Sequence, residues 1–199
     1  MHRPQPNHPE ALADRAADQL AFIRDTMVRA GRFTAVPGIG MMGAGVVGVI
    51  AAVVAPHART PLEWLAVWLS AAVIAIAFSL ALMIRKAHRS GQSLRAGPGR
   101  TFALAFAPPL AAGALLTLAM VRAEAWSLLP GTWLVCYGAA VVSGGAFSVR
   151  VVPVMGTVIV SLGALTLFLP TVTHTWMLGA GFGATELIFG YIIARYHGG

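Results

Sequence analysis

Charged residues and cysteine are both scarce in this chain, and each scarcity excludes a class of protein. Only 11% of the 199 residues are charged, whereas a soluble globular domain carries about 25%, so an ordinary soluble domain is excluded. The single cysteine, Cys136, lies within an apolar stretch. It can form neither an intramolecular disulfide nor a cysteine-based zinc site, and we interpret it as a small buried hydrophobic residue.

Motifs of catalysis and cofactor binding are also missing. The sequence has no P-loop lysine and no Rossmann glycine spacing, and it lacks the paired aspartates or zinc motif of an intramembrane protease. Haem bound between helices would need histidines inside the apolar stretches, but His57 and His174 lie at their ends. We therefore expect no enzyme, no catalytic residue, no metal site and no cofactor. The basic segments lack interleaved aromatic residues, so we also expect no nucleic-acid partner.

Long hydrophobic runs are what the chain has instead. About 20 apolar residues are needed for a helix to cross about 30 Å of hydrocarbon, and backbone groups in lipid must bond within the segment. The sequence thus predicts an all-α polytopic membrane protein, with a bundle of six transmembrane helices in a domain at residues 36–199. A capping box with Thr60 as N-cap and Glu63 reaching back begins the second helix. The six apolar stretches are residues 36–55, 62–84, 101–121, 130–148, 152–170 and 175–194.

Basic residues are distributed unequally between the two ends of these stretches. With the N-terminus inside, twelve of the 14 Lys and Arg lie on the cytoplasmic side, and only Arg59 and Arg122 lie outside. This strong positive-inside bias predicts that both termini are cytoplasmic. All five tryptophans lie near the outer ends of the stretches, where an interfacial aromatic belt would place them. The excess of Arg over Lys, with abundant Ala and Gly, indicates a bacterial genome and hence the inner membrane.

Residues 1–35 precede the first apolar stretch and are predicted to form a cytoplasmic tail and an amphipathic helix. Residues 1–9 are polar and rich in proline, which is typical of disorder. Residues 10–32 repeat apolar side chains at helical spacing. Such a helix could lie on the cytoplasmic leaflet or dock on a cytosolic partner, and the mixed charge of its polar face leaves both alternatives open.

Glu186 is the only acid well inside a predicted span. A charged side chain at mid-membrane costs at least roughly 2.5–3.5 kcal/mol, so it should be protonated or partnered. Gly179, Gly183, Glu186 and Gly190 share one helix face, so we expect Glu186 to point at another helix. A neutral carboxylic acid that donates a hydrogen bond is the expected resting state, and a proton- or cation-handling role is the alternative.

Prolines and small residues complete the candidate sites. Pro108 and Pro109 interrupt the third stretch and predict a kink, which marks a transport site in some membrane proteins. The first stretch carries the small residues Gly40, Ala44, Gly48 and Ala52, and the sixth carries Gly179 and Gly183. These stripes predict helix packing, within one chain or along a homo-oligomer seam.

A faint repeat relates the two halves of the domain. Pro37-Gly38 and Gly45 match Pro130-Gly131 and Gly138 at one constant offset. With three spans in each half, the halves would be inverted, as in many transporters. Three matches in glycine-rich helices are better explained by chance.

Three segments carry a resemblance to a known group of proteins. The chain resembles small bacterial six-span integral membrane proteins of unassigned function, and the resemblance implies a bacterial cytoplasmic membrane and no particular activity. From the residues we expect a non-enzymatic membrane subunit, scaffold or regulatory partner. The alternative is a small transporter or ion- or proton-conducting protein that uses Glu186 and the proline kink. The segments are Phe33–Gly38, Phe102–Pro109, and Pro130–Trp133 followed by Gly144–Arg150.

Overall fold

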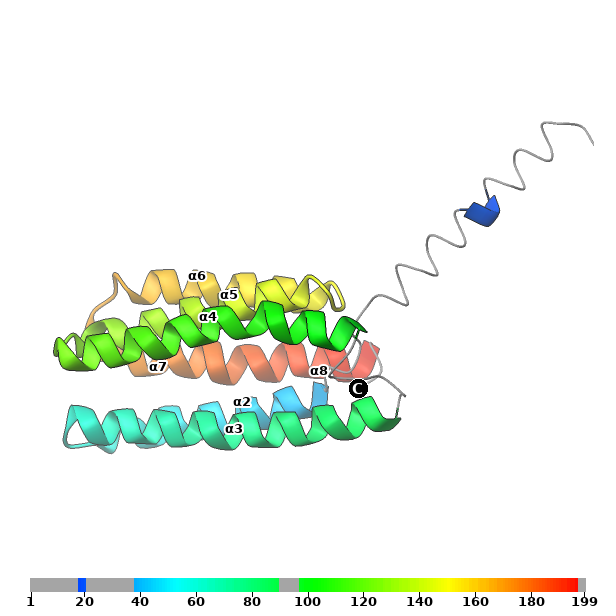
Figure 1. The fold of residues 1–199 in the computed structure, drawn as a ribbon. Helices are drawn as coiled ribbons and strands as arrows, with labels where there is room; N and C mark the ends of the chain where they lie inside the picture. Colours follow the sequence, from blue (N-terminus) through cyan, green and yellow to red (C-terminus); the bar gives the residue numbers. More distant parts are fainter. Residues whose placement is uncertain (1–17, 21–37, 90–96, 197–199) are drawn as a thin grey trace, which may run out of the picture. The chain divides into compact units, whose positions relative to one another are not determined.

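The computed structural model describes residues 18–20, 38–89 and 97–196 (Figure 1). The chain divides into two compact units, Met1–Arg32 and Phe33–Gly199. Within the first unit, residues 18–20 are helical and exposed. The rest of the predicted amphipathic helix lies outside the described residues.

The described part of the second unit consists of helices and short turns, without strands. Successive long helices run back and forth along one axis (Figure 1). The elements are α2 (Gly38–Val54), η1 (Ala55–His57), α3 (Pro61–Arg89), α4 (Gly97–Arg122), η2 (Trp126–Leu128), α5 (Leu129–Gly145), α6 (Val151–Thr166), η3 (Thr171–Thr173), α7 (His174–Leu178), the π-helix η4 (Gly179–Thr185) and α8 (Glu186–Tyr196).

Five helical segments of the described chain are long and apolar enough to cross a membrane. They correspond to five of the six predicted spans, and the last of them combines η3, α7, η4 and α8. The predicted span at 152–170 is a helix only over Val151–Thr166, which makes α6 shorter than each of these five segments. The all-helical, membrane-compatible fold is therefore confirmed, whereas the number of spans stays a prediction.

The predicted capping box begins α3. The Glu63 backbone N–H donates to the Thr60 hydroxyl at 3.1 Å, as an N-cap requires. The Glu63 carboxylate accepts a bond from the backbone N–H of Arg59 at 2.7 Å, one residue before the N-cap. Both bonds satisfy backbone groups that would otherwise lack partners at the turn.

Glycines allow α2 to pack tightly against the last helices. A Cβ added at Gly38 would lie 2.6 Å from the carbonyl oxygen of Gly190, and one at Gly48 would lie 2.5 Å from that of Phe182. A Cβ added at Gly45 would lie 2.9 Å from the carbonyl oxygen of Gly183. Backbones this close are typical of small-residue contacts between membrane helices.

A second glycine-lined pair is formed by α5 and α6. A Cβ at Gly138 would lie 2.7 Å from the Val160 nitrogen, and one at Gly163 would lie 2.6 Å from the Val135 nitrogen. Gly138 thus packs on the fifth predicted span, whereas Gly45, its match in the faint repeat, packs on the sixth. In an inverted repeat the sixth span would match the third, so the partner of Gly138 in α5 would be α4. The observed contacts therefore favour chance as the origin of the match.

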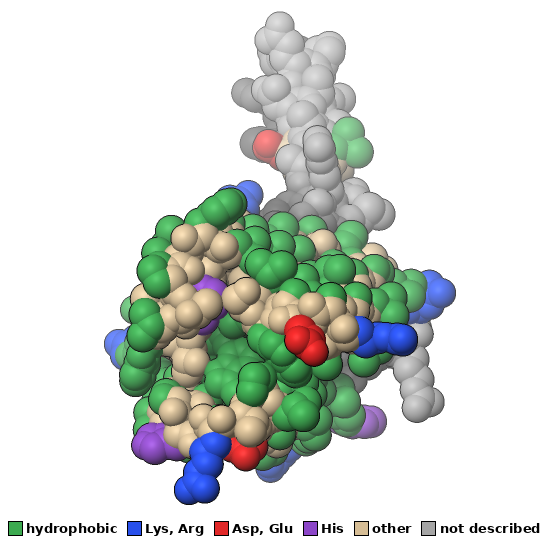
Figure 2. Space-filling view, turned by 90° about the vertical axis from the view of Figure 1, so that its left-hand side faces the viewer, with side chains coloured by type: hydrophobic (Ala, Val, Ile, Leu, Met, Phe, Trp, Pro, Cys, Tyr) green, Lys and Arg blue, Asp and Glu red, His purple; other side chains and the backbone are tan. Residues whose placement is uncertain are grey.

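The two remaining long helices, α3 and α4, lie on the outside. Helix α3 packs on α2, and α4 packs on α5. Only 6% of the most apolar window of each helix is buried, as suits helices surrounded by lipid. Helix α4 continues through the prolines that predicted its interruption. Figure 2 shows the end where α2 meets α3 and α4 meets α5: hydrophobic side chains line a hollow, and backbone and other side chains form part of its rim.

Candidate functional site

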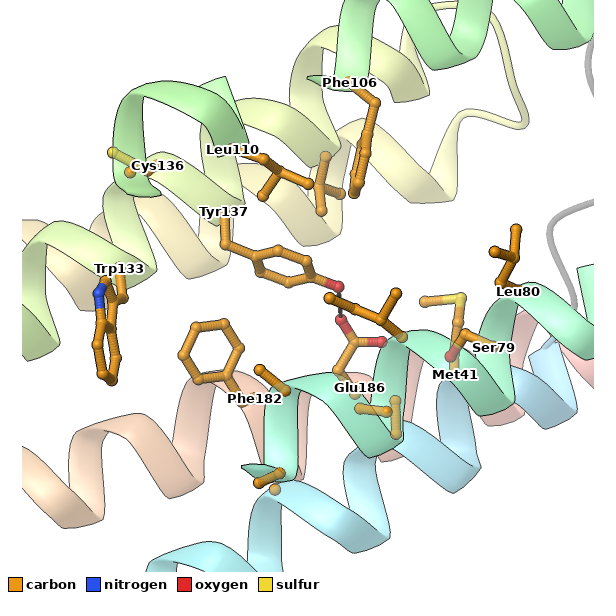
Figure 3. Close-up of a pocket in the computed structure, with 18 of the residues that line it drawn as sticks. Met41, Ser79, Leu80, Phe106, Leu110, Trp133, Cys136, Tyr137, Phe182 and Glu186 are labelled. Carbon is orange, nitrogen blue, oxygen red and sulfur yellow. Dashed lines mark hydrogen bonds between the residues drawn. The ribbon is translucent and has the colours of Figure 1, made fainter. Parts of the chain in front are cut away.

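A cavity of about 610 Å³ lies between the α2–α3 pair and the helices α4, α5 and α6. Its walls include side chains of α3 and α4, with η4 and the start of α8 contributing Phe182 and Glu186 (Figure 3). The lining is overwhelmingly apolar and the cavity is partly open. Its volume falls within the range of about 300–1,000 Å³ that is usual for pockets that hold small organic molecules.

Glu186 is the only Asp, Glu, Lys or Arg among the described residues that line this cavity. Its side chain is 3% exposed. The Tyr137 hydroxyl, from the middle of α5, donates a hydrogen bond to Glu186 Oε1 (Figure 3). The carboxyl group therefore accepts this bond, and the predicted role as a donor is not the one that this contact shows.

The second carboxyl oxygen of Glu186 is turned away from Tyr137 (Figure 3). No further hydrogen bond to this carboxyl group occurs within the described part of the chain. A buried carboxyl group with one donor keeps a strong unused capacity for a hydrogen-bond donor or a positive charge. Glu186 is therefore the residue of the cavity wall best able to bind a polar or charged group of a ligand.

The π-helix that precedes Glu186 sets its direction. In η4 the Thr185 hydroxyl donates to the Ala180 carbonyl five residues back, at 2.9 Å. Gly183 and Gly190 face α2, but Gly181 faces Leu134 of α5. The sequence predicted that these glycines and Glu186 share one helix face. In the structure the glycines of that face contact α2, whereas Glu186 contacts Tyr137 of α5. Wide turns of this kind often occur at functional sites.

Aromatic rings surround the hydrogen-bonded pair. Phe106 of α4 meets Tyr137 edge-on, with ring centroids 6.3 Å apart, and Phe182 meets it at 5.2 Å. Trp68 of α3 lies 6.3 Å from Phe182. Four separate helical elements, α3, α4, α5 and η4, thus contribute rings to the cavity wall, and α4 and α5 contribute two each.

The tryptophans differ in part from the predicted aromatic belt, because three of them pack inside the helical unit. Trp64 and Trp133 stack with centroids 5.6 Å apart, and their indole N–H groups donate to the hydroxyls of Thr175 and Thr117. Trp68 is 4% exposed, and its N–H has no partner in the described chain. These three side chains turn inward, where their rings pack against one another and against the core. The exposed Trp176 fits the belt.

Of the other predicted site residues, the prolines lie outside the cavity lining, and the small residues contact neighbouring helices or line the cavity. Pro108 and Pro109 do not line the cavity, although their neighbours Phe106 and Leu110 do. Ala44 and Gly48 line it, and the Gly40 carbonyl accepts the Ser79 hydroxyl of α3 at 3.2 Å. A Cβ at Gly179 would lie 2.7 Å from Ala52. The structure thus brings Glu186 to a cavity without bringing the prolines beside it.

Sequence reasoning missed Tyr137 and the rings around it. A phenol hydroxyl inside an apolar stretch needs a hydrogen-bond partner, and this requirement could have paired Tyr137 with Glu186. The phenylalanines gave no such signal, because they look like ordinary apolar residues. Among the described residues, no group of three or more His, Cys, Asp or Glu side chains could hold a metal ion.

Comparisons of the chain with protein families, with curated proteins and with solved structures found no match. The fold and the cavity therefore define the class of protein. Its described residues form helices, five segments of which are long and apolar enough to cross a membrane, and one carboxyl group lies on the wall of an apolar cavity. The resemblance to small bacterial membrane proteins stays a prediction.

Proposed function

We propose that this protein is a membrane-embedded binding protein or small transporter for apolar molecules, which occupy the cavity beside Glu186. The observation that carries the proposal is the cavity itself, which has a volume of about 610 Å³ and an apolar lining. Glu186 is the single Asp or Glu among the described residues of that lining. A scaffold that acted only through its surface would have no need of such a space. The small-residue contacts of α2 are made within the chain, which leaves fewer of them for a partner protein.

The proposed setting is a bacterial inner membrane crossed six times, with both termini in the cytoplasm and the amphipathic segment before the first span. The charge distribution supports this orientation, since Arg59 and Arg122 are the only basic residues on the proposed outer side. Association with another copy or another membrane subunit is compatible with the exposed faces of α3 and α4. A scaffold role remains the second candidate on that ground.

Filling the cavity tests the proposal. Ala75 lines the cavity, whereas Ala77, two residues further along α3, is exposed and does not. The probe is the neutral apolar fluorophore phenylnaphthylamine, added to purified protein in detergent. Energy transfer from the cavity tryptophans to bound probe should fall strongly in Ala75→Phe and stay near the wild-type level in Ala77→Phe.

The background in this experiment is probe dissolved in the detergent, which is the same for all three proteins. Equal energy transfer in the wild type and both variants would contradict the proposal. If a stoichiometric protein partner then co-purified from native membranes, the scaffold role would be favoured instead.

A further inference from the structure

We propose, on the basis of the function proposed above, that the cavity selects lipophilic cations. These are molecules in which aromatic or aliphatic groups surround an ammonium or phosphonium centre. Glu186 would be the counter-ion of that centre, and the rings of Trp68, Phe106, Tyr137 and Phe182 would contact its apolar groups.

The charge of the cavity favours a positive ligand. No Lys or Arg side chain lines it in the described part of the chain, so nothing there neutralises an ionised Glu186. A buried charge without a partner is strongly unfavourable, and a cation brought by the ligand would remove that penalty. Attraction between opposite charges is also much stronger in an apolar environment than in water. An anion in the same place would be repelled.

The hydrogen bond from Tyr137 supports this role. It occupies Oε1 of Glu186 and leaves the second oxygen without a partner in the described chain. A cationic centre could therefore approach the second oxygen while the tyrosine bond persists.

Aromatic rings supply the second source of selectivity. The faces of Trp, Tyr and Phe rings attract cations, by about 0.5–2 kcal/mol depending on desolvation. Tyr137 and Phe182 both project into the space between α3 and α4, beside the carboxyl group (Figure 3). A quaternary centre with apolar substituents would contact these rings and bury its substituents at the same time.

Strongly polar ligands are disfavoured by the scarcity of unused polar groups. Two hydroxyls that line the cavity are already engaged with backbone carbonyls: Ser79 with Gly40, and Thr117 with Gly113. A sugar or amino acid would lose its hydration without gaining enough hydrogen bonds. The cavity thus suits a ligand with one charge and a large apolar surface.

The experiment compares two probes of nearly equal size and shape but opposite charge, tetraphenylphosphonium and tetraphenylborate, each competing with phenylnaphthylamine in the wild-type protein. We expect tetraphenylphosphonium to displace the fluorophore at a concentration, expressed per mole of detergent, that is at least about tenfold lower than that of tetraphenylborate. This comparison needs no variant and so does not depend on the folding of one.

A matched pair of variants then assigns the preference to Glu186. Glu186→Gln keeps the size of the side chain and an acceptor for Tyr137, and it should reduce tetraphenylphosphonium affinity at least about tenfold while phenylnaphthylamine still binds. Glu124→Gln removes one acid from an exposed turn that does not line the cavity. It should leave both affinities unchanged.

The possible results separate this inference from the proposed function. Equal displacement by the two ions, or equal effects of the two variants, would overturn the cation selectivity while binding of the neutral probe kept the proposed function intact. If no probe bound, both would be wrong. Selective loss of the cation in Glu186→Gln alone would support both.

Discussion

Glu186 and Tyr137 form a hydrogen bond between two side chains on the cavity wall. Glu186 was identified from the sequence, because an acid inside an apolar stretch is conspicuous. Its partner was not, since the pairing joins residues 49 positions apart and depends on the rotation of two helices. That rotation is set by the π-helix before Glu186 and by the glycine contacts, neither of which the apolar pattern specifies.

Two substitutions of Glu186 should show whether its hydrogen bond or its ionisable group contributes to the free energy of unfolding. Glu186→Gln keeps an acceptor for Tyr137, so the free energy of unfolding should change by no more than roughly 0.5–1.5 kcal/mol. Glu186→Leu leaves a buried hydroxyl without a partner and should cost about 1–3 kcal/mol. Equilibrium unfolding in mixed detergent and denaturant measures both.

The double variant Glu186→Leu/Tyr137→Phe is the control for this prediction. Removing both partners leaves no unsatisfied group, so the double variant should be more stable than Glu186→Leu alone. If instead the losses of the two single variants simply added, the hydrogen bond would have no role in stability.

At the scale of the helices, the sequence predicted which segments are helical and about how long they are. It predicted less about which helices pack against one another. The apolar runs predicted helices within about five residues of those observed. The largest differences are at α3, which continues past the predicted 84 to Arg89, and at the fifth predicted span, which ends at Thr166 rather than 170. Apolar periodicity could not distinguish lipid from a neighbouring helix, because both are apolar. The pairing of α5 with α6 depends on close backbone contacts, and the inward turn of Trp68 depends on its packing against Phe182. Only the three-dimensional structure reveals either.

A methyl group at Gly138 should separate α5 from α6. The added Cβ would lie 2.7 Å from a backbone nitrogen and 2.8 Å from a backbone oxygen, and neither can move without the helix. We expect Gly138→Ala to lower the free energy of unfolding by about 1–3 kcal/mol, as overpacking does. Thermal unfolding of purified protein in detergent measures the change.

Gly43→Ala is the matched control. The three atoms nearest to its Cβ would all belong to the ring of Phe78, a side chain that is 45% exposed and can turn aside. The control should therefore be destabilised less than Gly138→Ala. Equal losses at the two positions would show that the α5–α6 contact is no tighter than an ordinary one.

At the scale of the whole molecule, the length of α6 decides how the membrane is crossed. Its 16 residues span about 24 Å at 1.5 Å per residue, less than the roughly 30 Å of a hydrocarbon core. Local thinning of the bilayer accommodates a short helix at modest cost. Six crossings would return the C-terminus to the side of the N-terminus, whereas five would not.

Reporter fusions distinguish these topologies. With six crossings and a cytoplasmic N-terminus, a fluorescent protein fused after Gly199 should fluoresce, and alkaline phosphatase fused there should be inactive. Phosphatase fused after Glu124, in the turn between α4 and α5, should be active. An active phosphatase at Gly199 would contradict the six-span topology.

The outward position of α3 and α4 has a consequence for how affinity is measured. Both helices line the cavity, and both leave most of their apolar surface uncovered. A lipophilic ligand dissolved in the surrounding membrane is therefore already at the wall of its site, at a concentration set by its partition coefficient. Each tenfold rise in partitioning would appear as a tenfold gain in apparent affinity, equivalent to about 1.4 kcal/mol, without any new contact. Dissociation constants for this protein are comparable between ligands only when expressed per mole of lipid or detergent.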